Sequence, residues 1–392
     1  MPSFTAPIPL ALYVHIPWCV RKCPYCDFNS HLAPTKLPEH AYIGALLADL
    51  EQDLPQVWGR RLESVFIGGG TPSLFSADSI ERLLAGLRTL LPLRPDMEVT
   101  LEANPGTVEQ AKFREFREAG VNRLSIGVQS FKNEHLRRLG RIHNKNEAIR
   151  AAEIAHSVGF ENFNLDLMYG LPEQTPEQAL ADVEQAIALA PTHISHYQLT
   201  LEPGTVFSKY PPRLPDDENL WTTQFYCQDR LAENGYRQYE VSAYARDGRR
   251  CRHNLNYWEF GDYLGIGAGA HAKLSDYTDG CAIRQWKQKN PRDYLGSAGK
   301  APCIAGHVTL SEADLGFEFM LNALRLTDGF PNSLFAERTG LRLEYFENTL
   351  AVAEELGLLF RGETRMQATE QGRRFLNDLL ELFLPEETAN YA

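Results

Sequence analysis

The sequence lacks any apolar run of about 18 residues, so we expect no transmembrane helix. No Lys or Arg precedes the apolar stretch within Met1–Leu12, which argues against a secretory signal peptide. Basic residues are also scarce, because 39 Lys and Arg stand against 51 Asp and Glu and leave a formal charge of −12. A protein that neutralises many phosphates is usually basic. We therefore expect a cytoplasmic protein that binds no nucleic acid.

Internal repeats and low-complexity tracts are absent too, and the composition is ordinary for a globular protein. Hydrophobic residues make up 43% of the 392 positions and charged residues make up 23%. These values exclude a collagen-like or wholly disordered chain. The length accommodates one large α/β domain and a smaller second domain.

Strand-like and helix-like patterns alternate over residues 11–201. The predicted strands are Ala11–Pro17, Ser64–Ile67, Glu98–Ala103, Arg123–Val128, Asn162–Met168 and His193–Leu201. The predicted helices are Ala41–Val57, Ser79–Leu91, Val108–Ala119, Asn146–Val158 and Pro176–Leu189, with Asp78 and Thr107 as candidate N-caps. This alternation implies an α/β fold with a parallel sheet, either doubly wound or barrel-like. Six units are too few for the closed eight-stranded barrel.

The pattern changes twice after this region, so we expect three parts: residues 1–205, 206–305 and 306–392. A proline-bearing connection, Glu202–Pro215, follows the alternating region. Beyond Leu310 the sequence suits short helices, a two-strand wing and a last amphipathic helix. The predicted helices there are Glu312–Leu324, Asn332–Thr339 and Leu343–Leu356. We interpret the apolar stripe of the last helix as core, and it comprises Phe375, Leu376, Leu379, Leu380, Phe383 and Leu384.

A cysteine motif follows the first predicted strand. Three of the seven cysteines, Cys19, Cys23 and Cys26, fall within eight residues as C-x3-C-x2-C. Three thiolates from one loop can bind three irons of a 4Fe-4S cluster and leave the fourth iron open to a small molecule. A zinc site usually takes four protein ligands and C-x2-C pairs. Disulfides are not expected, because a large cytosolic protein does not need them. The remaining alternative is that the three cysteines are unrelated free thiols.

Polar residues and glycines recur at the ends of the predicted strands. Gly68–Pro72 follows the second strand, and such glycines let the backbone approach a ligand and offer N–H donors. Glu102 and Gln129 end the third and fourth strands, and Asp166 lies near the end of the fifth. Strand ends on one edge of a parallel sheet are where such folds place ligand contacts. Arg141 could reach a ligand carboxylate.

The cysteine motif with Tyr25, followed by the glycine-rich turn, resembles the radical S-adenosyl-L-methionine (SAM) superfamily. The resemblance implies a partial (β/α)6 barrel, in which the amino and carboxylate groups of SAM chelate the open iron. The reduced cluster then cleaves SAM to a 5′-deoxyadenosyl radical. The implied SAM contacts are Tyr13, Tyr25, Gly69, Gly70, Thr71, Glu102, Gln129, Arg141, Asp166 and Thr200, with His271 at a further contact.

Within that superfamily, motifs over nearly the whole chain resemble the group around the oxygen-independent coproporphyrinogen III dehydrogenase. They are YVHIPWCVRKCPYCDF, IGGGTPS, LEANPGT, RLSIGVQSF, NLDLMYGLPEQT and HNLNYWEFGDYLGIGAGAH. Residues 306–392 resemble the small helical, winged-helix-like domain of this group. Two departures argue against the dehydrogenase activity. Phe28 stands where the dehydrogenase has a fourth cysteine, and only eighteen residues precede Cys19.

The segment His253–Trp258 reads HNLNYW, a pattern that resembles the haem chaperones of this group. Neutral imidazole is a usual axial ligand of haem iron, so His253 is the candidate ligand. Cys251 is a rival thiolate ligand. Tyr257 and Trp258 offer flat apolar faces to a porphyrin. Alternatively, His253 caps a turn and Trp258 fills the core.

Two hypotheses follow. In the first, the protein binds haem, a 4Fe-4S cluster and SAM, delivers haem to a membrane-associated haemoprotein, and makes transient contact with the membrane, with a dimer as one assembly. In the second, it is an enzyme that decarboxylates coproporphyrinogen III to protoporphyrinogen IX. A zinc-stabilised barrel without radical chemistry is a third reading.

Overall fold

One curved sheet forms the frame of the protein, whose computed structural model describes residues 2–4, 7–107, 110–277 and 279–385. In these ranges the sheet has 12 strands in the order β14-β13-β12-β11-β1-β4-β5-β6-β7-β8-β10-β9. Its centre consists of parallel strands, namely β1 (Leu10–Ile16), β4 (Leu62–Gly69), β5 (Leu93–Ala103), β6 (Arg123–Gln129), β7 (Phe163–Tyr169) and β8 (His193–Gln198). The six predicted strands are thus confirmed, with ends that shift by a few residues.

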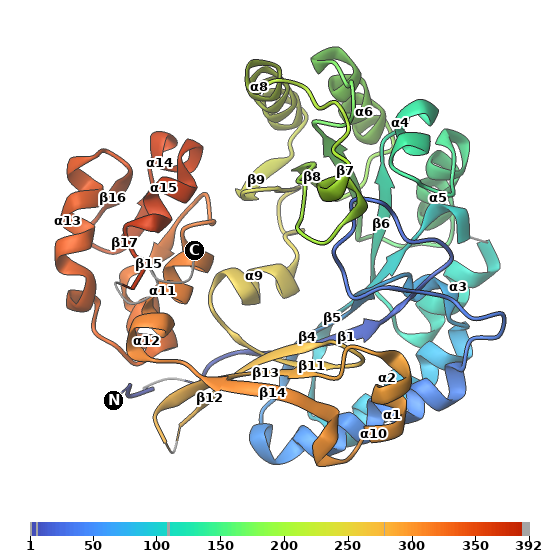
Figure 1. Ribbon diagram of the computed structural model, residues 1–392, viewed down its shortest axis with the longest axis horizontal. Coiled ribbons are helices and arrows are strands. Elements are labelled where there is room, and N and C mark those ends of the chain that lie inside the picture. Colours follow the sequence, from blue (N-terminus) through green and yellow to red (C-terminus); the bar gives the residue numbers. More distant parts are fainter. Residues whose placement is uncertain (1, 5–6, 108–109, 278, 386–392) are drawn as a thin grey trace.

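Helices cover the outer, convex face of this sheet (Figure 1). They are α1 (Glu39–Asp53), α2 (Ala77–Leu90), α3 (Gln110–Ala119), α4 (Asn133–Arg138), α5 (Lys145–Ser157), α6 (Pro176–Ala188) and α8 (Asp217–Glu233). Their apolar stripes pack on strands whose own side chains are buried on both faces, which is why the strand segments read as near-continuous apolar runs. The predicted start at Val108 lies outside the described residues.

Strands that the sequence patterns did not predict extend both edges of the parallel sheet. On one edge, β11 (Asp262–Ile266) pairs parallel to β1, and antiparallel strands continue the sheet, namely β12 (His271–Asp276), β13 (Cys281–Lys287) and β14 (Ile304–Thr309). On the other edge, β10 (Ala243–Ala245) and β9 (Arg237–Glu240) follow β8. In the described ranges β9 and β14 do not pair, so the barrel stays open, as the partial barrel predicts.

A smaller C-terminal unit stands at this open side (Figure 1). Its helices are α11 (Glu312–Ala323), α12 (Asn332–Thr339), α13 (Glu347–Glu355), α14 (Glu370–Arg374) and α15 (Leu376–Glu381). Its sheet is β15 (Phe330–Pro331), β17 (Arg365–Ala368) and β16 (Leu359–Arg361), in that order. A second hydrophobic core, built around Phe319, Phe335 and Phe346, holds the unit together. The predicted wing corresponds to β16 and β17.

Two local predictions need correction. Asp78 does not cap α2: the Ser76 side chain accepts from the backbone N–H of Ser79 at 3.3 Å, and Asp78 lies in the first helical turn. The last predicted helix is broken at Phe375 into α14 and α15. Of its apolar stripe, Leu379, Leu380 and Phe383 are buried, whereas Phe375 and Leu384 are exposed. No helix in the described ranges is long and apolar enough to cross a membrane.

Candidate functional site

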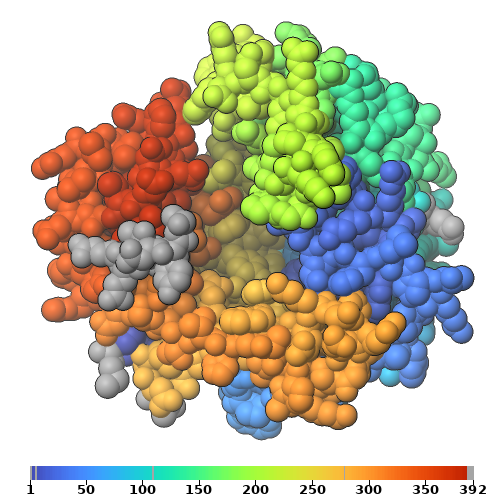
Figure 2. Space-filling view, in the orientation of Figure 1, coloured from blue at the N-terminus to red at the C-terminus, as the bar shows by residue number. Residues whose placement is uncertain are grey.

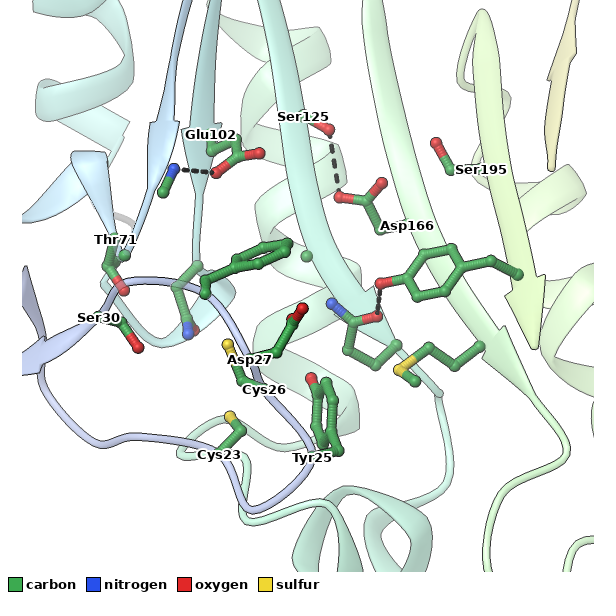
Figure 3. A pocket seen from close by; sticks show the side chains of 18 of the residues that line it. Cys23, Tyr25, Cys26, Asp27, Ser30, Thr71, Glu102, Ser125, Asp166 and Ser195 are labelled. Carbon is green, nitrogen blue, oxygen red and sulfur yellow. Dashed lines mark hydrogen bonds between the residues drawn. The ribbon is translucent and has the colours of Figure 1, made fainter. Parts of the chain in front are cut away.

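A cavity of about 870 Å³ lies at the carboxyl ends of the parallel strands, inside the curve of the sheet (Figure 3). Its walls come from the strand ends of β4 to β8, from the cysteine loop, and from α9 (Arg252–Trp258). Its size falls in the range of small-molecule and cofactor sites. Because parallel strands present their carboxyl ends at one edge, residues far apart in the sequence meet here.

The three motif cysteines line the mouth of this cavity. Cys19 ends β2 (Trp18–Cys19), which pairs with β3 (His31–Leu32) and so closes the loop that carries Cys23 and Cys26. All three thiols are half-buried, and Figure 3 shows those of Cys23 and Cys26 on the same side of the loop. Burial raises the pKa of the Cys19 and Cys26 thiols, and the neighbouring Cys23 adds to the effect.

This donor set is compatible with an iron–sulfur cluster. No group of three His, Cys, Asp or Glu side chains in the described residues is arranged to hold one metal ion. A four-iron cluster is wider than one ion, so its ligand thiols stand farther apart. Cys19 and Cys26, whose thiols have a raised pKa, would gain from a positively charged group that stabilises the thiolates. The loop therefore meets the chemical requirement of a 4Fe-4S cluster.

The turn after β4 brings bare backbone to the cysteine loop. Gly69 has a φ of 109°, which favours glycine. A Cβ atom on Gly70 would stand 2.6 Å from the carbonyl oxygen of Trp18, so this position excludes a side chain. The N–H of Gly69 donates to Oε2 of Glu102 at 3.0 Å. The turn and the end of β5 are thus tied into one polar wall.

Two partly buried carboxyl groups, Glu102 and Asp166, face the cavity (Figure 3). Burial, with the charge of Asp166 as the second cause, raises the pKa of Glu102 to about 8. Burial also raises the pKa of Asp166, although Asn164 and Ser125 donate hydrogen bonds to it at 2.7 and 3.1 Å. Neither carboxylate has a cationic partner within ion-pair distance among the described residues. The pair is suited to bind a cation or ribose-type hydroxyl groups.

Gln129 and Arg141 complete the polar lining. Gln129 lies at an irregularity between β6 and β7 and has a φ of 68°, which is unusual for a residue with a side chain. Its Oε1 accepts a hydrogen bond from the Tyr197 hydroxyl at 2.7 Å. Arg141 donates to the Gly127 carbonyl at 2.7 Å, and its Nε is buried without an acceptor. An anionic group of a ligand could satisfy that donor.

The structure brings most of the predicted SAM contacts together in this cavity. The residues that line it are Tyr25, Gly69, Gly70, Thr71, Glu102, Gln129, Arg141, Asp166 and Thr200. Two predicted contacts, Tyr13 and His271, do not line it. The Tyr13 hydroxyl instead bonds to Nδ1 of His15 at 3.0 Å, and His271 stacks against Trp286. Thr200 donates to Glu202 at 2.7 Å.

The candidate haem ligands lie beneath the cavity wall. His253 is 2% exposed, and its Nδ1 is 3.0 Å from Oγ of Ser64. Its Nε2 is buried without a partner, and burial lowers its pKa to about 3, so the ring is neutral. Cys251 is fully buried, and its thiol donates to Glu98. The cavity is lined instead by Asn254, Tyr257 and Trp258 from the same helix.

Sequence reasoning missed several lining residues, among them Ser125, Ser195 and Tyr197. All three lie on strands β6 and β8, at alternate positions whose side chains point to the same face of the sheet. A signal was therefore available, because the two-residue period of a strand places Ser195 and Tyr197 on one face and Ser125 on the face of Gly127. Glu240, which ends the edge strand β9, and Ser242, which follows it, also line the cavity, and the sequence did not predict this strand.

The sequence and the fold of this protein are similar to those of known proteins. Residues 13–186 match the radical SAM superfamily, and residues 310–375 match the HemN C-terminal domain. The "Heme chaperone HemW" of Escherichia coli (strain K12) is 50% identical over 96% of this chain and 99% of that protein. The protein of the same description from Bacillus subtilis (strain 168) is 34% identical over 95% and 99%. The structure of E. coli coproporphyrinogen III oxidase (HemN) superposes with a TM-score of 0.81 at 25% identity, covering 96% of this chain and 90% of that one.

Proposed function

This chain belongs to the HemW family of radical SAM proteins. We therefore propose that it is a haem chaperone, which binds haem and passes it to a haemoprotein. The observation that carries the proposal is the composition of the central cavity. Tyr257 and Trp258 line a cavity of about 870 Å³ together with a polar wall and three thiols. That combination suits a large flat molecule beside a cluster and a small polar cofactor.

Cys19, Cys23 and Cys26 would hold a 4Fe-4S cluster, and the strand-end wall would hold SAM. Glu102 and Asp166 offer carboxylates to the cationic or hydroxyl groups of SAM, and Arg141 offers a buried donor to its carboxylate. When bound, the cluster and SAM together supply one-electron chemistry. The residues of this chain position SAM, exclude water from it and neutralise its charges.

Contact with haem is supported by α9. The Nε1 donor of Trp258 is buried and has no acceptor among the described residues, so a ligand carboxylate could accept from it. Ligation by His253 stays part of the proposal, and so does ligation by the rival Cys251. In either case α9 would first have to separate from β4, because His253 packs on Phe66 with ring centres 5.0 Å apart.

Delivery to a membrane-associated haemoprotein, transient membrane contact and dimerisation complete the proposed function. Phe375 and Leu384 are the exposed part of the apolar stripe in the C-terminal unit and are the candidates for such contacts. A flotation assay with liposomes, with and without haem, tests the membrane contact. Absence of flotation in both conditions would refute it.

A second candidate function is the oxidative decarboxylation of coproporphyrinogen III. The similarity in fold to HemN favours it. Phe28, which is 56% exposed and lines the cavity, argues against it, because it stands at the position of the dehydrogenase's fourth cysteine. The two functions are separated by assaying haem binding and vinyl-group formation on the same protein.

The experiment for the proposed function is a haem titration of anaerobically reconstituted full-length protein, followed at the Soret band. We expect stoichiometric binding, and we expect Trp258→Ala to weaken it about tenfold through loss of one flat contact. Trp58→Ala is the matched control, since Trp58 is 83% exposed and lies outside the central cavity. No haem binding, or equal losses in both variants, would refute the proposal.

A further inference from the structure

A second cavity, of about 750 Å³, lies between α8, the β9 edge and the C-terminal unit. Figure 2 shows the molecule hollowed between the red C-terminal unit and the yellow-green α8 region. None of its lining residues belongs to the predicted SAM or cluster sites. We propose that this cavity is a second binding site for a flat apolar ring system that carries carboxylates, and that its ligand is a porphyrin such as haem. The inference rests on the proposed function.

One wall of the second cavity is aromatic. Trp221, Phe225 and Tyr226 project from α8 and are 46%, 53% and 51% exposed. Trp221 and Phe225 are four residues apart, so they share one helix face. Large aromatic side chains gathered on an open cavity wall are a costly feature in water and typically mark a binding surface. Their flat faces suit a stacked ring system.

The rest of the lining carries three arginines and two acidic residues, Asp229 and Glu370. The arginines are Arg325, Arg373 and Arg374, and two of them already have carboxylate partners. Arg374 pairs with Glu370 at 2.6 Å, and Arg325 pairs with Glu240 at 3.1 Å. Arg373 donates only to the Ala368 carbonyl at 3.5 Å and pairs with no carboxylate in the described ranges. Its guanidinium is therefore the group that can donate hydrogen bonds to a ligand carboxylate.

The lining also indicates how the ligand is held. Within the described residues its lining contains no His, Cys or Met, and Tyr226 is its only side chain of a type that ligates haem iron. The aromatic faces and the arginines recognise the ring and its carboxylates, which a metal-free porphyrin shares with haem. The site should therefore take a metal-free porphyrin as well as haem, unlike a site that depends on an iron ligand.

A thin wall separates this site from the central cavity. Arg325 lines the second cavity, whereas Glu240 and Trp258 line the central one. The Arg325 guanidinium carbon lies 4.3 Å from the centre of the Trp258 ring, and Glu240 is 2% exposed. A single layer of side chains thus divides the two spaces. The second site is placed to receive or release the porphyrin that the central cavity holds.

The test is a pair of titrations on full-length reconstituted protein, one with haem and one with metal-free protoporphyrin IX, each read for stoichiometry and affinity. We expect Phe225→Ala and Arg373→Glu to remove one equivalent of bound protoporphyrin IX, or to weaken that binding about tenfold. Arg292→Glu, an exposed charge change on the far α10 (Pro291–Ser297), should leave both titrations unchanged. Protoporphyrin IX dimethyl ester should bind more weakly than the diacid, because Arg373 loses its partner.

The outcomes separate the two claims. If wild-type protein binds haem but the two variants take up protoporphyrin IX as it does, or if the ester binds as well as the diacid, the second site is refuted. Haem binding without any binding of protoporphyrin IX refutes it too. If wild-type protein binds neither molecule, the proposed function itself fails.

Discussion

The Nδ1 atom of His253 lies 3.0 Å from the hydroxyl oxygen of Ser64, beneath the wall of the central cavity and not inside it. The ring is held from the other side by Phe66 and is met edge-on by Tyr257. This arrangement divides the HNLNYW motif into two parts. His253 anchors α9 to β4, while Tyr257 and Trp258 line the cavity.

Burial of His253 makes stability depend on pH. Its pKa falls from 6.5 to about 3, so the unfolded chain binds a proton that the folded protein does not between these values. Stability is therefore fully present above pH 6.5 and is lost as pH falls towards 3. We predict that His253→Gln reduces the slope of unfolding free energy against pH by up to about 1.4 kcal/mol per unit in this window. His40→Gln, at an exposed position, serves as the control in urea unfolding, and an unchanged slope in His253→Gln would contradict the prediction.

If the cysteine loop binds a 4Fe-4S cluster, the iron content of the protein depends on its three thiols. Replacement of Cys19, Cys23 or Cys26 by Ala should remove iron and acid-labile sulfide together with the brown colour, because three thiolates leave no spare ligand. Cys281→Ala is the matched control, since Cys281 is a partly exposed thiol on β13 outside the cavity. Iron and sulfide analysis after anaerobic reconstitution checks this. A variant of the triad that keeps wild-type iron and sulfide would refute the assignment, and one zinc ion without sulfide would favour the zinc reading.

If Glu102 contacts a cationic group of SAM, its contribution to SAM affinity depends on pH. Because its pKa is raised to about 8, the carboxyl of the free protein is largely protonated at pH 6 and ionises as pH approaches 8. A cationic ligand favours the ionised form, so the ratio of SAM affinities between wild type and Glu102→Gln should grow as pH rises from 6 to 8 and then level off. The growth is at most about tenfold per pH unit. Equilibrium binding at several pH values measures it, with exposed Glu118→Gln as control. A ratio independent of pH would rule out a charged contact.

Gly70 tests the close approach of the glycine turn to the cysteine loop. A Cβ atom there would meet the Trp18 backbone at 2.6 Å, and backbone cannot move away as a flexible side chain can. We expect Gly70→Ala to cost about 1–3 kcal/mol of stability and to weaken SAM binding. Gly296→Ala, where a Cβ meets nothing within 4 Å inside α10, should be neutral or stabilising. Equal melting temperatures for the two variants would show that the turn tolerates a side chain.

The order of strands and helices up to β8 could be predicted from the sequence, because buried parallel strands and amphipathic helices leave strong periodic signals. The strands at the two edges of the sheet could not be predicted in this way. Asp262–Ile266 lies within the glycine-rich segment GDYLGIGAGAH, yet it pairs parallel to β1, and only the tertiary pairing makes it a strand. The N-cap of α2 is Ser76 and not the predicted Asp78. Both residues are suitable caps near the start of the helix, and the local sequence pattern does not show which of them takes the position.

The site was predictable in part for a similar reason. Glu102 and Gln129 lie at or next to the ends of β5 and β6, and strand ends meet at one edge by topology alone, whereas Asp166 lies in the middle of β7 (Phe163–Tyr169). The depth of His253 was not predictable, because a motif gives residue order and not the face of a seven-residue helix that packs on β4. Arg325, which divides the two cavities, comes from the C-terminal unit, and its contact with Trp258 depends on how that unit docks.

The paired assay on one anaerobically reconstituted sample tests the central claim most directly. Haem is added to one half and followed at the Soret band, and the other half receives coproporphyrinogen III, SAM and a reductant. The account predicts stoichiometric haem binding and no vinyl product. Formation of protoporphyrinogen IX without haem binding would contradict it.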